Sequence, residues 1–217
     1  MKKPPFAAVF RGALAGKSIS RILTNEAIRT KCAGLKGRVL DIAGGLAPSY
    51  LAYLPQEIAL VRTDITASPG VVAVDMNAIL PFPDNSFDAV MCFNALYIAD
   101  DPAALSREVH RVLKSRASWY VASPFVANEM PEPHDYRRFT AEGLERLFKD
   151  AGFSSSVEIN RIGERGSAAM ALLSPFCVFN IVRAFAYPIA LMFDSLVPAK
   201  VRREHPSPLG YFCIVRK

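Results

Sequence analysis

The stretch VLDIAGGLAPSY at residues 39–50 constrains the fold more than any other part of the chain. Apolar residues surround an aspartate in its first half, as in a strand, and two adjacent glycines follow. Glycine at the end of a strand marks a tight turn or a place where a ligand approaches the backbone. The stretch therefore predicts a strand that ends in a sharp turn next to a ligand.

Strand and helix patterns alternate along the chain. We expect strands at residues 38–43, 57–62, 71–74, 87–93, 117–122 and 157–162 and in the final GYFCIVRK. We expect helices at residues 17–32, 46–54, 101–114 and 140–153. This alternation predicts an α/β fold of the Rossmann-like, doubly wound type. Its seven-stranded sheet should be mostly parallel, with helices on both faces.

The length of 217 residues suits one domain. We expect an N-terminal helical leader over residues 1–36 and the domain itself over residues 37–217. Residues 167–182 carry no charge, and a second uncharged run covers 184–193, so we expect an apolar helical hairpin inserted at 167–200, before the last strand. Four roles stay open for this hairpin: a lid, a homodimer face, a peripheral membrane contact, or packing against the domain's own core.

Charge and cysteine content limit the partners. The net charge is +6, but the basic residues are scattered in small groups, so we expect no nucleic-acid partner. The four cysteines are far apart and show no metal-binding spacing, which favours reduced thiols, a cytoplasmic location and no metal site. Peripheral contact with a membrane is an alternative to a purely cytoplasmic location.

Polar residues follow each of the first four predicted strands, at the edge where ligands bind in sheets of this kind. Asp64 lies 19 positions after Gly45, a spacing at which a carboxylate can accept hydrogen bonds from both hydroxyls of a ribose. A dinucleotide site is disfavoured, because residues 43–48 read AGGLAP and do not match G-x-G-x-x-G.

Five segments together resemble the ordered motifs of class I S-adenosylmethionine-dependent methyltransferases. They read VLDIAGG, TDI, PFPDNSFDAVMC, DDPAALSREVHRVLK and EPHDYRRFTAEGLERLF. The resemblance runs from about residue 37 to residue 153 and is closest to small-molecule methyltransferases of the type 11 group.

The resemblance implies S-adenosyl-L-methionine as cofactor and a role for each matched residue. Its methionine part would lie over Asp41, Ala43, Gly44 and Gly45, its ribose would lie at Asp64 and Ile65, and its adenine beside Asp75 and Met76. Asn94 would face the sulfonium and the acceptor. The family usually has glycine where this chain has Ala43, and often near Ala47, so these two methyl groups narrow the predicted pocket.

The candidates for acid–base chemistry cluster after the fifth predicted strand. His134 can take a proton from an acceptor hydroxyl or amine, and Tyr136 and Asn94 complete the catalytic candidates. Arg137 and Arg138 can clamp a carboxylate or phosphate of the acceptor. Purely structural roles stay open: a loop histidine bonded to a carboxylate, and arginines in salt bridges.

These features predict transfer of a methyl group to a hydroxyl or amine of a small molecule, such as a sugar, a secondary metabolite or a lipid-linked intermediate. The alternative is a catalytically inactive binding or scaffolding subunit of the same fold, which Ala43 and Ala47 favour. A nucleic-acid methyltransferase is a third interpretation, but residues 94–97 read NALY rather than (D/N)PPY.

Overall fold

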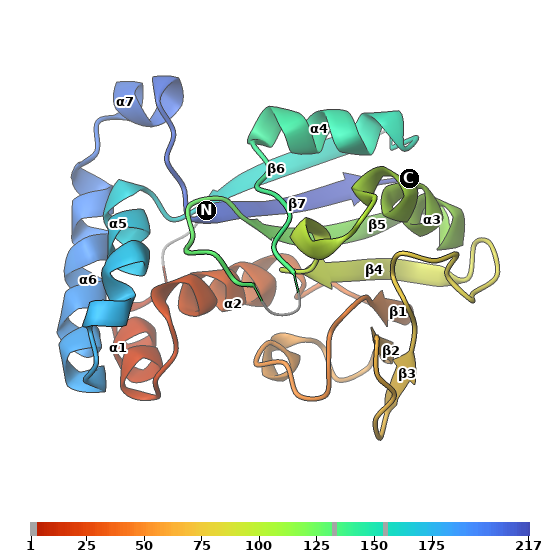
Figure 1. The fold of residues 1–217 in the computed structure, drawn as a ribbon, viewed down its shortest axis with the longest axis horizontal. Helices are drawn as coiled ribbons and strands as arrows, with labels where there is room; N and C mark the ends of the chain where they lie inside the picture. Colours follow the sequence, from red (N-terminus) through yellow and green to blue (C-terminus); the bar gives the residue numbers. More distant parts are fainter. Residues whose placement is uncertain (1–3, 132–133, 154–155) are drawn as a thin grey trace.

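The computed structural model describes residues 4–131, 134–153 and 156–217 (Figure 1). Seven strands form one sheet in the order β3-β2-β1-β4-β5-β7-β6. Their bounds are β1 Arg38–Asp41, β2 Ala59–Asp64, β3 Val71–Ala73, β4 Phe87–Phe93, β5 Leu113–Pro124, β6 Ser156–Ile162 and β7 Gly210–Arg216. An α/β fold with a seven-stranded sheet is thus confirmed.

The sheet is mixed, so the prediction of a mostly parallel sheet was wrong. The pairs from β3 through β5 are parallel, whereas β7 is antiparallel to both of its neighbours, β5 and β6. Ile162 at the end of β6 lies opposite Gly210 at the start of β7. The segment between β6 and β7 therefore starts and ends at the same side of the sheet. As a result β7 runs antiparallel between β5 and β6.

Helices cover both faces of the sheet, as predicted (Figure 1). The helices are α1 Phe6–Leu14, α2 Ile19–Lys31, α3 Pro102–Val112, α4 Ala141–Asp150, α5 Arg165–Leu173, α6 Asn180–Leu196 and α7 Ala199–Glu204, with short 3₁₀ turns η1 Leu51–Tyr53, η2 Leu96–Ile98 and η3 Ser174–Phe176. Alternate residues of β4 point to opposite sides. Met91 belongs to the core under α1, α2, α5 and α6, and Cys92 to the core under α3 and α4.

Local sequence signals locate the starts of three helices, but one predicted helix is wrong. At the start of α2 the Ser18 hydroxyl accepts a hydrogen bond from a backbone N–H of the first turn. The Asp101 carboxylate does the same at the start of α3, and the Thr140 hydroxyl at the start of α4. The predicted helix over residues 46–54 is wrong, since only the single turn η1 forms there. Pro48 and Pro55 bracket a stretch too short to hold more than one turn.

Helices α1, α5 and α6 pack together beside the sheet, past the end of β6 and the start of β7 (Figure 1). Close packing of α5 on α6 requires Gly166, because a Cβ there would lie 2.4 Å from the carbonyl oxygen of Ala190. Residues 167–200 cover most of α5, all of η3 and α6, and the start of α7, and their status as an insertion stays a prediction. No helix in the described part of the chain is long and apolar enough to cross a membrane.

The predicted leader packs into the domain. The apolar side chains of Val9 and Ala13 in α1 and of Ile19 and Leu23 in α2 are buried in the same core as residues of β1, β4 and β7. Helices α1 and α2 therefore share a core with the sheet. The domain boundary at residue 36 stays a prediction.

Candidate active site

The turn after β1 is built around a buried carboxyl group. Asp41 ends β1 and is fully buried, and its Oδ2 accepts a hydrogen bond of 2.8 Å from the Tyr50 hydroxyl. Its Oδ1 has no partner among the described residues. A Cβ on Gly44 would lie 2.2 Å from Asp41 Oδ2 and 2.9 Å from the Tyr50 hydroxyl, so only glycine fits there.

Burial raises the pKa of Asp41 from its ordinary value of 3.8 to about 7, although the Tyr50 hydroxyl and Arg62 oppose the shift. Burial and the neighbouring Asp41 also raise the pKa of the Tyr50 hydroxyl, which therefore remains a hydrogen-bond donor. A buried carboxyl group with one oxygen unpaired suits a ligand that brings a hydrogen-bond donor to the turn.

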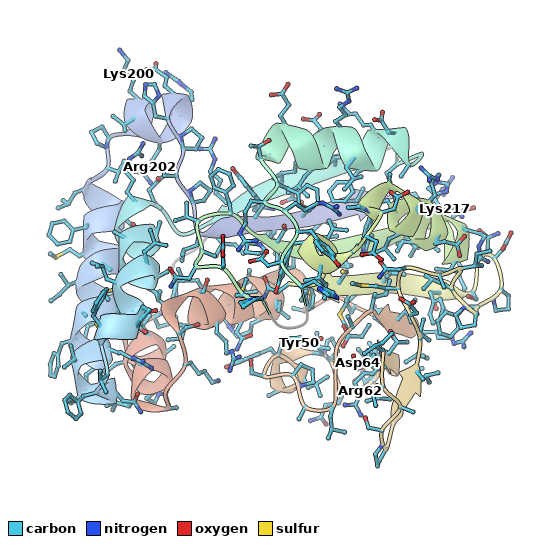
Figure 2. All side chains as sticks on the ribbon, in the orientation of Figure 1. Tyr50, Arg62, Asp64, Lys200, Arg202 and Lys217 are labelled. Carbon is cyan, nitrogen blue, oxygen red and sulfur yellow. The ribbon has the colours of Figure 1, made fainter. Side chains whose placement is uncertain are left out.

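The structure brings Gly45 and Asp64 together. Gly45 has a φ of +68°, and a Cβ on it would lie 3.2 Å from Oδ2 of Asp64, at the end of β2. Oδ1 of Asp64 accepts the backbone N–H of Ile65 at 2.7 Å, and the side chain of Ile65 is 67% exposed. Figure 2 shows Asp64 and Tyr50 in the same region, beside β1 and β2.

The other two strand ends are more open. Asp75 follows β3 and is exposed, and its Oδ1 accepts the backbone N–H of Asn77 at 2.9 Å. Met76 is partly buried against the core under α3 and α4. Asn94 follows β4, is exposed, and has a φ of +53°, a conformation that asparagine tolerates better than most residues.

Asn94 and Tyr50 also line a cleft of about 540 Å³. Its lining comes from α2 and its N-cap, from the turn after β1, from the ends of β4 and β5 and the loop after β5, and from the end of α5 and η3. The lining residues are Ser18, Ser20, Arg21, Thr24, Asn25, Ile28, Ala47, Pro48, Ser49, Tyr50, Phe93, Asn94, Pro124, Val126, Ala127, Asn128, Met130, Ala171 and Ser174.

The contribution of α2 to the cleft and the bond from Tyr50 to Asp41 were not predicted from the sequence. The signal for α2 was present: Ser18, Arg21, Asn25 and Ile28 follow one another at intervals of three or four residues, which places them on one face of the helix. Tyr50 gave no comparable signal, because its bond to Asp41 depends on the path of the turn between them.

The loop of the proposed catalytic residues lies beside the cleft and not in it. His134 and Tyr136 are both exposed, their rings stack at 5.1 Å with an interplanar angle of 13°, and neither lines the cleft. The loop is tied to the cleft through Asp135, whose Oδ2 accepts the backbone N–H of Met130 at 2.9 Å. Glu132 and Pro133 of the predicted motif lie outside the described residues.

Both arginines of this loop are engaged with the protein. Arg138 pairs with Asp135 at 2.6 Å, which lowers the pKa of that carboxyl group, and its guanidinium lies 5.5 Å from the centre of the Tyr97 ring. Arg137 donates to the carbonyl oxygens of Ala99 and Asp100. The structure therefore gives both arginines roles in holding the loop, and it places neither in the cleft lining.

The His, Cys, Asp and Glu side chains lie too far apart to form a metal-binding group in the part of the chain that the structure describes. Over residues 4–131, 134–153 and 156–217, no three of the His, Cys, Asp and Glu side chains group together in a way that could hold a metal ion. All four cysteines are free, and Cys32, Cys92 and Cys213 are buried.

Comparison with known proteins agrees with this geometry. A family model described as "Methyltransferase domain" matches residues 46–121. The uncharacterized methyltransferase YcgJ of Bacillus subtilis is 29% identical over 117 residues, which cover 47% of this chain and 46% of YcgJ. This chain thus spans about half the length of that curated relative.

Solved structures share the fold at low identity. A SAM-dependent methyltransferase from Archaeoglobus fulgidus superposes with a TM-score of 0.62 at 19% identity, covering 98% of this chain and all of that one. Phosphoethanolamine N-methyltransferase 2 of Haemonchus contortus, in complex with S-adenosyl-L-methionine, gives 0.61 at 16% identity, with 89% of this chain and 52% of that chain covered.

The fold and the glycine turn define a class I methyltransferase-type α/β domain. The matched family model and the curated relative support a methyltransferase domain in this chain, and the solved structures share its fold; both agree with the resemblance to class I S-adenosylmethionine-dependent methyltransferases. The cofactor of this class is S-adenosyl-L-methionine. The residues present fit it, since the turn leaves no room for a side chain at Gly44, Asp41 keeps an unpaired oxygen, and Gly45 adjoins Asp64.

Ala43 adopts a φ of +54°, in the left-handed region, which costs a residue with a Cβ about 1–2 kcal/mol. Ala43→Gly removes this cost. Glycine also has more backbone freedom in the unfolded chain, which lowers the free energy of unfolding by roughly 0.5–1 kcal/mol. We therefore expect the free energy of unfolding, measured in urea, to rise by roughly 0.5–1 kcal/mol.

Ala47→Gly is the matched control for this substitution. Ala47 is exposed in the same turn and is not among the residues with positive φ, so we expect its replacement to lower stability slightly. Equal shifts in both variants would contradict the assigned strain at Ala43.

Proposed function

We propose that the protein is a methyltransferase that transfers the methyl group of S-adenosyl-L-methionine to a hydroxyl or amine of a small acceptor bound in the cleft. One observation carries the proposal: the glycine turn and the cleft share a wall. Tyr50 donates to Asp41 beneath the turn and also lines the cleft, and Asn94 lines it from the next strand of the sheet.

We assign the cofactor to the strand ends. Asp41, Ala43, Gly44 and Gly45 would hold its methionine part, and Asp64 would accept hydrogen bonds from the ribose hydroxyls beside Ile65. Asp75 and Met76 would border the adenine. When bound, the sulfonium supplies an activated methyl group, and the protein has only to hold donor and acceptor in line.

The cleft lining supports a small polar acceptor. Hydroxyl and amide side chains from α2 face the cleft together with those of Ser49, Asn94 and Asn128, and Phe93 and Val126 add apolar contact. Arg21 is the only charged side chain among the described lining residues. This lining suits a polyhydroxylated or amide-bearing molecule, free or linked to a lipid, and Arg21 suits an anionic group on it.

Turnover with a panel of acceptors tests this function directly. Purified protein would be incubated with methyl-labelled S-adenosylmethionine and sugars, glycolipids and amines, and label transfer would be followed. We expect label in at least one hydroxyl or amine acceptor. Tight cofactor binding without transfer to any acceptor would favour the scaffolding alternative, which the intact glycine turn and Asp64 do not support.

We further propose that His134 assists removal of a proton from the acceptor. The proposal rests on the hydrogen bond that ties its loop to the cleft at Met130. General-base catalysis contributes about 10²–10⁴-fold to rates. We therefore expect His134→Ala to lower turnover by at least about tenfold, while the Kd for S-adenosylhomocysteine stays unchanged.

His205→Ala is the matched control, because His205 is also exposed but lies at the end of α7. Its turnover should equal that of the wild type at every pH. If His134→Ala also keeps wild-type turnover across the pH range, His134 is not a base and the stacked His134–Tyr136 pair has a structural role.

A further inference from the structure

The outer surface of α5, η3 and α6 is apolar and exposed. Large apolar side chains between residues 172 and 196 stand out from it, together with Phe6 of α1, and we call this set the apolar face. Phe176 is 83% exposed, Val178 73% and Phe179 70%. Contiguous exposed apolar surface on this scale marks an interaction site in a water-soluble domain.

Helix α6 shows that this exposure is systematic. Ala184, Tyr187 and Leu191 face inward and are buried, whereas Ile181 and Phe185 begin a row of exposed apolar residues on the outer side. That row recurs at intervals of three or four residues along the 17-residue helix, which is about 25 Å long. A helix of this kind faces water only at a cost, because a surface helix normally presents polar residues outward.

The charged side chains of α6 do not break the apolar row. Asp194 is buried and accepts the backbone N–H of Ser167 at 3.0 Å. Arg183 is partly buried, and its Nε donates to the carbonyl oxygen of Cys177 at 2.7 Å. Neither charged residue of α6 therefore lies in its exposed apolar row.

The charges that border the apolar face are mainly positive. Residues 161–204 contain six Lys and Arg residues and three acidic residues. Glu164 pairs with Arg165 at 3.3 Å and Asp194 is buried, so the exposed charges near the end of α6 are mostly those of Lys200, Arg203 and Glu204. Lys200 and Arg202 lie on α7, at one end of α6 (Figure 2). Arg11 is exposed on α1, the helix that packs beside α6. An apolar surface with a cationic border complements an anionic lipid bilayer.

We propose that the apolar face docks on the surface of an anionic bilayer, with α6 lying in the plane of the interface. Phe176 and Phe179 protrude from the connection before α6 and enter the region of the acyl chains. Lys200 and Arg203 contact the headgroups from α7. The contact is peripheral and reversible, and it uses the side of α6 that the fold leaves uncovered.

Docking also brings the cleft to the membrane. Ala171 and Ser174 line the cleft, and Leu172, Leu173 and Phe176 of the apolar face adjoin them in sequence. A polar headgroup could enter the cleft while its lipid tail stays in the bilayer. This consequence rests on the proposed function, whereas the docking itself does not.

Flotation with vesicles tests the docking. Full-length protein would be mixed with vesicles of phosphatidylcholine alone or of phosphatidylcholine with phosphatidylglycerol. We expect flotation with the anionic vesicles, weaker flotation with the neutral ones, and at least tenfold weaker binding after Phe176→Ser and Phe179→Ser together. Lys200→Glu should weaken binding to anionic vesicles several-fold and leave binding to neutral vesicles unchanged.

Matched controls come from exposed positions far from the apolar face. Ile79→Ser replaces a side chain that is 79% exposed in the loop before β4, and Arg146→Glu reverses a charge on α4 whose side chain is 84% exposed. Both should bind like the wild type. Circular dichroism and S-adenosylhomocysteine affinity in solution would verify the fold of each variant, and Phe176→Arg alone would replace a double variant that does not fold.

Two results would overturn the proposal. One is a folded wild type that floats with neither kind of vesicle. The other is a wild-type dimer in light scattering that the phenylalanine substitutions dissociate and that added vesicles leave intact. That result would make the apolar face a contact between two copies of the chain. Loss of cofactor binding in solution would count against the proposed function and not against docking.

Discussion

Replacing Asp41 by asparagine is expected to remove a pH dependence of stability that the wild type shows between about pH 4 and pH 7. The pKa of this carboxyl group is raised from 3.8 to about 7 in the folded protein because the group is buried. In that window the folded protein keeps the proton and the unfolded chain has lost it. Stability therefore falls as the pH rises through the window and is constant, for this group, on either side.

The size of the effect follows from the two pKa values. One pKa unit corresponds to about 1.4 kcal/mol, so the interval from 3.8 to about 7 amounts to about 4 kcal/mol. Asparagine at position 41 does not titrate. The free energy of unfolding of Asp41→Asn, taken relative to the wild type in urea at each pH, should therefore rise by about 4 kcal/mol from about pH 4 to pH 8.

Asp150→Asn provides the comparison, since Asp150 ends α4 with a side chain that is 67% exposed. Its free energy of unfolding should differ from that of the wild type by a nearly constant amount over the same range. A similarly flat difference for Asp41→Asn would show that Asp41 ionises normally in the folded protein and that its pocket is hydrated.

The sequence was informative where the signal is local. The capping side chains of Ser18, Asp101 and Thr140 mark helix starts within a residue or two of the observed ones, because a cap is a contact between near neighbours. The spacing from Gly45 to Asp64 placed two residues side by side for a similar reason: parallel neighbouring strands end at one edge.

The errors concern contacts between distant segments. The direction of β7 depends on how residues 163–209 return to the sheet, and no pattern within β7 encodes it. The α2 wall of the cleft lies more than 60 residues from Asn94 in sequence, so only the tertiary fold brings them together. The exposed side of α6 had the same apolar composition as a buried helix, and burial alone distinguishes the two.

Asp64→Ala is expected to cause the largest loss of cofactor affinity of any single substitution in the turn region. We propose that this carboxylate accepts hydrogen bonds from both ribose hydroxyls, and hydrogen bonds to a charged group are worth about 1.5–3 kcal/mol each. Allowing for water that replaces the lost carboxylate, the Kd for S-adenosylhomocysteine should rise by a factor of roughly 30–700, or about 2–4 kcal/mol.

Calorimetric titration of wild type, Asp64→Ala and Asp100→Ala with S-adenosylmethionine and S-adenosylhomocysteine gives the decisive comparison. Asp100 is an exposed aspartate near the end of η2, and its replacement should leave both affinities unchanged. Equal affinity in wild type and Asp64→Ala would place the ribose elsewhere. Absence of binding by a folded wild type would count against the proposed cofactor site at Gly44, Gly45 and Asp64 and would indicate that the methyl groups of Ala43 and Ala47 close the pocket.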